Sequence, residues 1–181
     1  MFSVLLGTDS GGSWEVDLGS SDNPERPTSI LIDVPLSALT SPLLLTLTYD
    51  MKLPPDVLAP TSGYVFDLTL SDPETGEFIT RFSEPIKIQL AYPAGSPQAD
   101  PAGKVLSYLD GSAKPPVWLT EDAALTQEDG SGGSIYLCGK TSHLTTFFMG
   151  AASAVPEPAS GLMILAGAGL MLRRREAAVQ R

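Results

Sequence analysis

The stretch that decides the fold runs from Tyr64 to Phe82 and reads YVFDLTLSDPETGEFITRF. Aromatic and leucine residues recur at every second position from Tyr64 to Leu70, the period of a β-strand with one buried face. Within the polar segment that follows, Pro73 fixes its own φ and Gly76 permits a positive φ. The pattern therefore predicts a β-hairpin that joins a strand at 64–70 to a strand at 77–82.

Short runs of the same kind recur along the chain. From Ile86 to Tyr92, Ile, Ile, Leu and Tyr alternate with Lys, Gln and Ala, which predicts another half-buried strand. Further strands are predicted at 14–18, 29–34, 43–49, 105–109, 117–119, 134–138 and 145–149. Residues 94–103 and 126–133 are rich in turn-forming residues and are predicted to be loops. We therefore expect an all-β domain over residues 1–150, an antiparallel Ig-like or Greek-key sandwich, with a barrel as the alternative.

Composition excludes several classes of protein. A hydrophobic content of 43% with 18% charged residues, in 181 residues, indicates one folded domain rather than a disordered chain. The formal net charge of −10 argues against nucleic acid as a partner. One Cys and one His exclude a disulfide framework, a zinc cluster and a three-His metal site. We expect no cofactor, and we expect Cys138 to be a small buried apolar residue.

The charge is divided unevenly along the chain. Residues 1–172 carry seven Lys and Arg against twenty Asp and Glu, whereas residues 173–181 carry four Arg and one Glu. The uncharged run ASGLMILAGAGLML, Ala159 to Leu172, lies before Arg173, Arg174 and Arg175. An apolar run closed by arginines is typical of a membrane segment with a cytoplasmic end, although a helix of 14 residues spans only about 21 Å. A buried C-terminal helix is the alternative.

Val155, Pro156, Glu157 and Pro158 stand directly before this run, and the two prolines favour an extended backbone there. The order of Pro-Glu-Pro, apolar run and arginine cluster resembles the PEP-CTERM sorting signal of Gram-negative, exopolysaccharide-producing bacteria. The resemblance implies that a membrane-embedded exosortase cleaves near Pro-Glu-Pro and passes the body to the cell surface or matrix. We accordingly expect a linker at 151–158 and a single membrane-type helix with its arginines at 159–181, held transiently in the inner membrane.

A protein with such a tail also needs an export signal. Met1 to Gly7, MFSVLLG, has no positively charged segment and only a short apolar one. We expect that the true start lies upstream of Met1 or that the sequence is a gene fragment. A degenerate copy that is not exported is the alternative.

One further segment, TSHLTTF from Thr141 to Phe147, contains the single histidine. It resembles the His-hydrophobic-Thr turn that ends some surface β-sandwiches, including the autoproteolytic GAIN domain. Carried over, the resemblance implies that His143 takes the hydroxyl proton of Thr145, which attacks the carbonyl of Leu144. The GAIN motif has paired cysteines upstream, whereas this chain has Cys138 alone. The alternative is a structural turn in which His143 and Thr145 only hydrogen-bond.

Other catalytic patterns are weak, since the sequence has no Gly-x-Ser-x-Gly elbow and no phosphate-binding loop. The leading hypothesis is a non-enzymatic, exported β-sandwich of the cell surface or extracellular matrix. One alternative is the self-cleaving surface domain. Another is a carbohydrate-binding module for extracellular polysaccharide, although the tryptophans and tyrosines are scattered singly rather than in a row.

Overall fold

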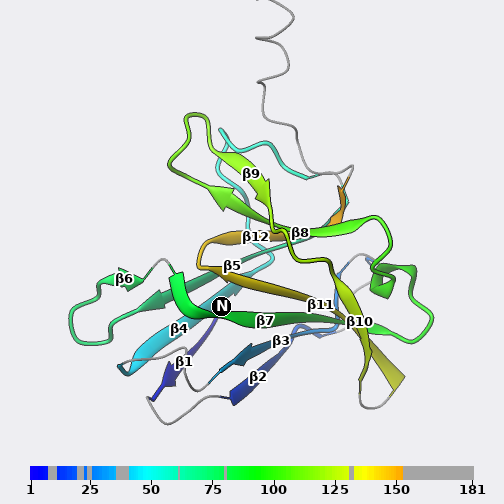
Figure 1. The fold of residues 1–181 in the computed structure, drawn as a ribbon, viewed down its shortest axis with the longest axis horizontal. Coiled ribbons are helices and arrows are strands. Elements are labelled where there is room, and N and C mark those ends of the chain that lie inside the picture. Colours follow the sequence, from blue (N-terminus) through cyan, green and yellow to red (C-terminus); the bar gives the residue numbers. More distant parts are fainter. Residues whose placement is uncertain are drawn as a thin grey trace, which may run out of the picture.

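The computed structural model of the protein describes residues 1–7, 12–19, 23, 26–35, 41–60, 62–79, 81–130 and 133–152. In this part of the chain, twelve strands form two antiparallel sheets, one of seven strands and one of five (Figure 1). Apart from the strands, these residues contain a short 3₁₀ turn at Pro97–Ala99. The all-β sandwich expected from the sequence is confirmed, and the barrel is not formed.

The first sheet has the strand order β1-β4-β5-β12-β8-β9, and β6 also pairs with β5. Its strands are β1 (Phe2–Leu6), β4 (Leu43–Tyr49), β5 (Gly63–Ser71), β6 (Phe78–Ile79), β8 (Lys104–Asp110), β9 (Val117–Thr120) and β12 (Thr146–Ala151). The last strand of the described residues, β12, thus lies inside the sheet between β5 and β8.

The second sheet has the order β10-β11-β7-β3-β2. Its strands are β2 (Gly12–Asp17), β3 (Ser29–Val34), β7 (Arg81–Pro93), β10 (Thr126–Asp129) and β11 (Ser134–His143). The chain passes between the sheets several times, so each sheet is assembled from segments far apart in the sequence. Whether this connectivity is Ig-like or Greek-key stays a prediction.

The core lies between the sheets and follows the alternation seen in the sequence. Leu45, Leu68, Ile32 and Ile88 are completely buried, and the rings of Phe66 and Phe147 stack with their centroids 5.6 Å apart. Burial of such side chains contributes roughly 1.5–3 kcal/mol each relative to leaving them exposed. The residues at every second position therefore provide most of the free energy that holds the two sheets together.

The predicted hairpin is confirmed. Leu70 and Ser71 pair with Ile79 and Phe78, and the turn between them is closed by the Gly76 amide, which donates to the Asp72 carbonyl at 2.9 Å. The Asp72 carboxylate accepts the amides of Glu74 and Thr75 at 2.7 and 2.9 Å. Gly76 has φ +72°, as the turn chemistry required. The bounds predicted for β3 and β4 also agree with the structure.

The single strand predicted at 77–82 is wrong, because the chain changes sheets within it. Phe78–Ile79 is β6 of the first sheet, whereas β7 begins at Arg81 in the second. The reason is competition for the edge of β5. Along that edge β12 pairs with residues 63–67 and the Leu68 amide donates to the Thr145 carbonyl, so β6 pairs only with Leu70 and Ser71.

Two further strands contradict the sequence-based predictions. Thr126–Asp129, expected as part of a loop, forms β10 and pairs with β11. All four of its residues are exposed, so it carries no apolar alternation. Phe2–Leu6, read only as a short apolar segment, forms β1 beside β4, with Leu6 completely buried.

The connection between β4 and β5 covers part of the outer face of the first sheet. Val57 from this connection packs with Trp118 and Phe148 in a second, smaller apolar cluster. The indole Nε1 of Trp118 donates to the Leu58 carbonyl at 2.8 Å. We call residues 51–60 the strap, because they hold this cluster away from water.

An ion pair joins the two sheets near the start of the strap. Arg26, between β2 and β3, contacts both carboxylate oxygens of Asp50, at 2.7 Å from Nη2 and 3.0 Å from Nε. Tyr64 donates its hydroxyl to the same carboxylate at 3.2 Å. Asp50 has φ 52°, a left-handed conformation that Asp and Asn tolerate better than most residues. The hydrogen bond from Arg26 is the main reason that the pKa of Asp50 lies below its ordinary value.

Replacing Phe147 by Ala should lower the free energy of unfolding by about 3–5 kcal/mol, because it leaves a cavity in the core. Phe147 is completely buried, whereas Phe78 is 70% exposed, so Phe78→Ala is the matched control and should change stability by less than about 0.5 kcal/mol. Urea denaturation of both variants measures the difference. Equal losses would contradict the placement of the core.

Replacing Asp50 by Asn should lower stability by about 0.5–1 kcal/mol at pH 7, discounted for solvent screening because the Asp50 side chain is 47% exposed. Asn tolerates the left-handed backbone, so the change removes the charge and little else. The pKa of Asp50 is lower in the folded protein than in the unfolded chain, where it is about 3.9. The stabilisation from the ion pair with Arg26 is therefore fully present above about pH 3.9 and is lost as the pH falls through the pKa of Asp50 in the folded protein. Urea midpoints of wild type and variant should converge in acid; a constant difference at every pH would refute the assignment.

Candidate functional site

The predicted His143-Leu144-Thr145 segment forms the crossing between the sheets. His143 is the last residue of β11 in the second sheet, and β12 of the first sheet begins at Thr146. Only Leu144 and Thr145 connect them, and the Leu144 side chain is buried. The pairing of β11 with β7 shifts register between Thr141 and His143, which turns the end of the strand toward the other sheet.

The imidazole of His143 is held on three sides. Its Nδ1 lies 2.9 Å from Oε1 of Glu121, and its Nε2 lies 3.1 Å from the guanidinium of Arg81. Its ring stacks on Tyr108 with centroids 3.9 Å apart. Because a guanidinium can only donate, Nε2 is the acceptor, which makes Nδ1–H the donor to Glu121 in the neutral ring. Glu121 also accepts the Thr141 hydroxyl.

The Thr145 hydroxyl is engaged elsewhere. It donates to the Leu109 carbonyl at 3.0 Å, while the Thr145 carbonyl accepts the Leu68 amide at 3.0 Å. The mechanism implied by the GAIN resemblance needs His143 to accept the Thr145 proton. The structure thus places the two residues on one turn but gives the imidazole and the hydroxyl other hydrogen-bond partners.

A hollow of about 300 Å³ opens beside this turn. Arg81, Tyr108, Asp110 and His143 contribute polar groups to its walls. Sequence reasoning found His143 but missed its partners Arg81, Tyr108 and Glu121, because they come from three other segments of the chain. A lone histidine in a sequence does not indicate which residues will surround it.

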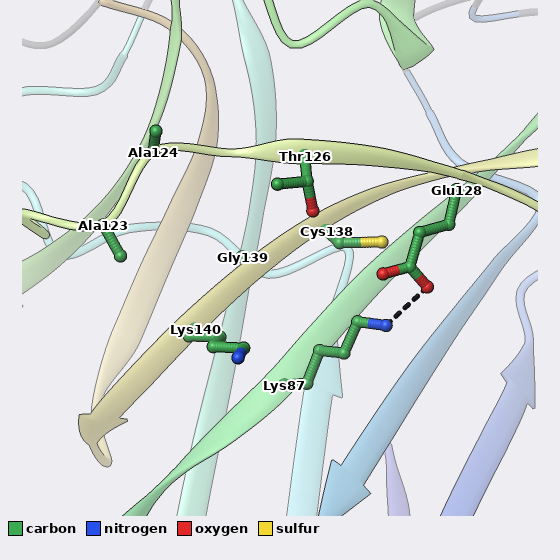
Figure 2. A pocket seen from close by; sticks show the side chains of 8 residues that line it. All are labelled: Lys87, Ala123, Ala124, Thr126, Glu128, Cys138, Gly139 and Lys140. Carbon is green, nitrogen blue, oxygen red and sulfur yellow. Dashed lines mark hydrogen bonds and ion pairs between the residues drawn. The ribbon is translucent and has the colours of Figure 1, made fainter.

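A second hollow, of about 430 Å³, lies on the outer face of the second sheet (Figure 2). Lys87 and Glu128 form an ion pair at 2.5 Å across it, and Thr126 and Cys138 line it beside them. Burial lowers the pKa of Lys87, but the hydrogen bond to Glu128 and nearby negative charges outweigh burial, so the net pKa is raised. Lys87 is therefore a charged side chain that is paired with Glu128.

Cys138 is a buried, protonated thiol. Its Sγ contacts Oε1 of Gln89 at 3.4 Å, and it is 2% exposed. Burial raises its pKa to about 11, so the thiolate that nucleophilic or metal chemistry requires is scarce at neutral pH. The expectation of a small buried residue is confirmed. Within the described ranges, no group of three or more His, Cys, Asp and Glu side chains could hold a metal ion.

The residues predicted for sorting, Val155 to Pro158 and Arg173 to Arg175, lie outside the described residues, as does the helix expected at 159–181. Among the residues that the structure does describe, no helix has the length and apolar character needed to cross a membrane. The described chain ends just after β12, where the Ala152 amide donates to the Gly103 carbonyl at 2.9 Å. The sorting segment thus follows, within a few residues, the end of an inner strand of the first sheet.

Comparison with family models identifies this segment. Residues 154–175 match the PEP-CTERM protein-sorting motif, and the match includes the Pro-Glu-Pro tripeptide, the apolar run and the three arginines. The resemblance noted in the sequence is therefore confirmed for the tail. A signal of this kind is recognised by an exosortase and implies export across the membrane to the cell surface or extracellular space. Neither the search of curated proteins nor the search of solved structures found a match to the chain.

The His143 turn gives a direct test of self-cleavage. Because the Thr145 hydroxyl and the His143 imidazole hold other partners, the full chain produced in cells without an exosortase should show a single intact mass. The matched control is Thr145→Ala, which should differ from wild type only by the mass of the substitution. Two fragments divided between Leu144 and Thr145, absent from the control, would contradict this expectation and establish autoproteolysis.

Proposed function

We propose that the protein is a non-enzymatic, exported β-sandwich of the cell surface or extracellular matrix, sorted by an exosortase through residues 155–175. The observation that carries this proposal is the match of residues 154–175 to the PEP-CTERM sorting motif. In this proposal, residues 159–172 form a single membrane-type helix that holds the chain transiently in the inner membrane. Cleavage near Pro-Glu-Pro then releases the body.

The charge distribution supports this orientation. With seven Lys and Arg against twenty Asp and Glu, residues 1–172 have a formal charge of −13, whereas residues 173–181 have a charge of +3. Positively charged residues beside an apolar segment favour the cytoplasmic side of a membrane. The acidic body then lies on the opposite side, where its net charge favours solubility.

The described body supports a non-enzymatic role. The hydroxyl of Thr145 and the imidazole of His143 are hydrogen-bonded to groups other than each other. The Cys138 thiol is buried and has a raised pKa. Thr145, His143 and Cys138, which could otherwise act as nucleophile or base, are thus each held in a hydrogen-bonded contact within the sandwich.

Replacing Pro156, Glu157 and Pro158 together by Ala should keep the protein in the inner membrane of a host that has the matching exosortase. The alanines remove the two prolines and the glutamate of the motif that the enzyme is expected to bind. Cell fractionation and the mass of the mature body measure the outcome. Release of this variant at the wild-type level would refute the proposal.

A matched control replaces Arg173, Arg174 and Arg175 by Lys. Lysine keeps the positive charge that sets the orientation, so this variant should be sorted like wild type. Retention of the lysine variant together with the alanine variant would show only that any change in the tail blocks export. Normal sorting of the lysine variant assigns the defect to Pro-Glu-Pro.

A further inference from the structure

The end of β12 is fixed firmly to the body. β12 pairs with β5 on one side and β8 on the other, and Phe147, Phe148 and Met149 are at most 1% exposed. Gly150 and Gly63 lie so close together that a Cβ placed on Gly150 would be 2.6 Å from the Cα of Gly63. Beyond them, the Ala152 amide is bonded to the Gly103 carbonyl. The chain is therefore part of the folded sandwich as far as Ala152.

The sorting motif begins very close to this point. Four residue steps separate Ala152 from Pro156, and a fully extended chain covers at most about 14 Å in that number of steps. A protein contact of ordinary size covers roughly 800 Å² on each partner, which corresponds to a circle of about 16 Å radius. An enzyme whose contact is centred on Pro156 would therefore reach the surface of the folded body.

Unravelling β12 would lengthen the tether, but the structure opposes it. Freeing residues 149–152 breaks hydrogen bonds to both neighbouring strands and exposes Met149, which belongs to the main core. The close contact of Gly63 with Gly150 would also be lost. Contact between enzyme and body is the arrangement that leaves the core intact.

We propose that the end of the sandwich around Gly103 and Ala152, which we call the exit surface, is a contact surface for the membrane-embedded sorting enzyme. The enzyme then reads the folded body together with the Pro-Glu-Pro motif. This inference rests on the proposed function. The chain itself determines which protein lies against this surface, since residues 153–155 alone connect it to the Pro-Glu-Pro tripeptide of the sorting motif.

The exit surface suits a close approach. Ala102 and Gly103 are exposed and uncharged, and they lie just before β8 begins at Lys104. Lys104 directs its ammonium group to the carbonyls of Pro97 and Asp100, which fixes the segment 97–104. Figure 1 shows the C-terminal end of β12, in orange, close to β8, and Ala151 pairs with Lys104.

The test places a bulky side chain on the exit surface of the full chain. In a host with the matching exosortase, Ala102→Trp should slow release of the mature body about tenfold, because the indole obstructs the enzyme. Ala113→Trp is the control for a bulky side chain placed away from the exit surface. Ala113 lies in the turn at the other end of β8, after Asp110, and this variant should be released at the wild-type rate. Pulse-chase labelling measures both rates.

A second variant with a longer linker distinguishes obstruction of the enzyme from misfolding of the body as the cause of slow release. Eight Gly and Ser residues inserted between Ser153 and Ala154 should restore release of Ala102→Trp, because the enzyme can then bind the motif away from the body. Wild-type release of Ala102→Trp with the native spacer would overturn the contact while leaving the sorting proposal intact, and so would a defect that the spacer does not relieve. If the unmodified chain were not released at all, the sorting proposal would fail and the contact with it.

Discussion

The fold depends on the insertion of β12 between β5 and β8. Without this strand the seven-stranded sheet would separate into β1-β4-β5 with β6, and β8-β9. Phe147 brings its ring onto Phe66 in the main core, while Phe148, on the opposite face, meets Trp118 under the strap. One strand of six residues thus fills both the main core and the outer cluster. It also determines how far β6 can extend along β5, and hence where the chain crosses to the second sheet.

The same strand joins the fold to the sorting segment. Its first residue follows the His143-Leu144-Thr145 turn. Its last residue, Ala151, and the hydrogen-bonded Ala152 belong to the sandwich, although the sequence predicts that the linker starts at residue 151. The partners of His143 come from β7, β8 and the segment after β9, so the turn is held by both sheets. An arrangement in which each polar group has a partner gives a rigid turn.

The sequence predicted those elements whose local pattern agrees with their position in the fold. β3, β4 and the 72–76 turn were predictable because alternation and turn chemistry act over a few neighbouring residues. β10 was not, because an edge strand with four exposed residues has no apolar face to reveal it. The change of sheet between Ile79 and Arg81 depends on β12, nearly seventy residues further along. Likewise, His143 was visible in the sequence, but Arg81, Tyr108 and Glu121 become its neighbours only through sheet pairing and packing. The sorting tail was readable because its order along the chain is itself the signal.

The strap places one of the two tryptophans in an environment different from that of the other, so that their fluorescence can be distinguished. The two tryptophans of the chain lie in different places: Trp14 packs at the margin of the main core, and Trp118 is buried beneath the strap with its indole bonded to Leu58. Their fluorescence therefore reports on separate parts of the structure. In the Trp14→Phe protein the tryptophan emission comes from Trp118 and follows the outer cluster, whereas the wild type also reports on the main core through Trp14. A change in the Trp118 signal with the Trp14 signal unchanged would then mark lifting of the strap, and a change in both would mark loss of the sandwich.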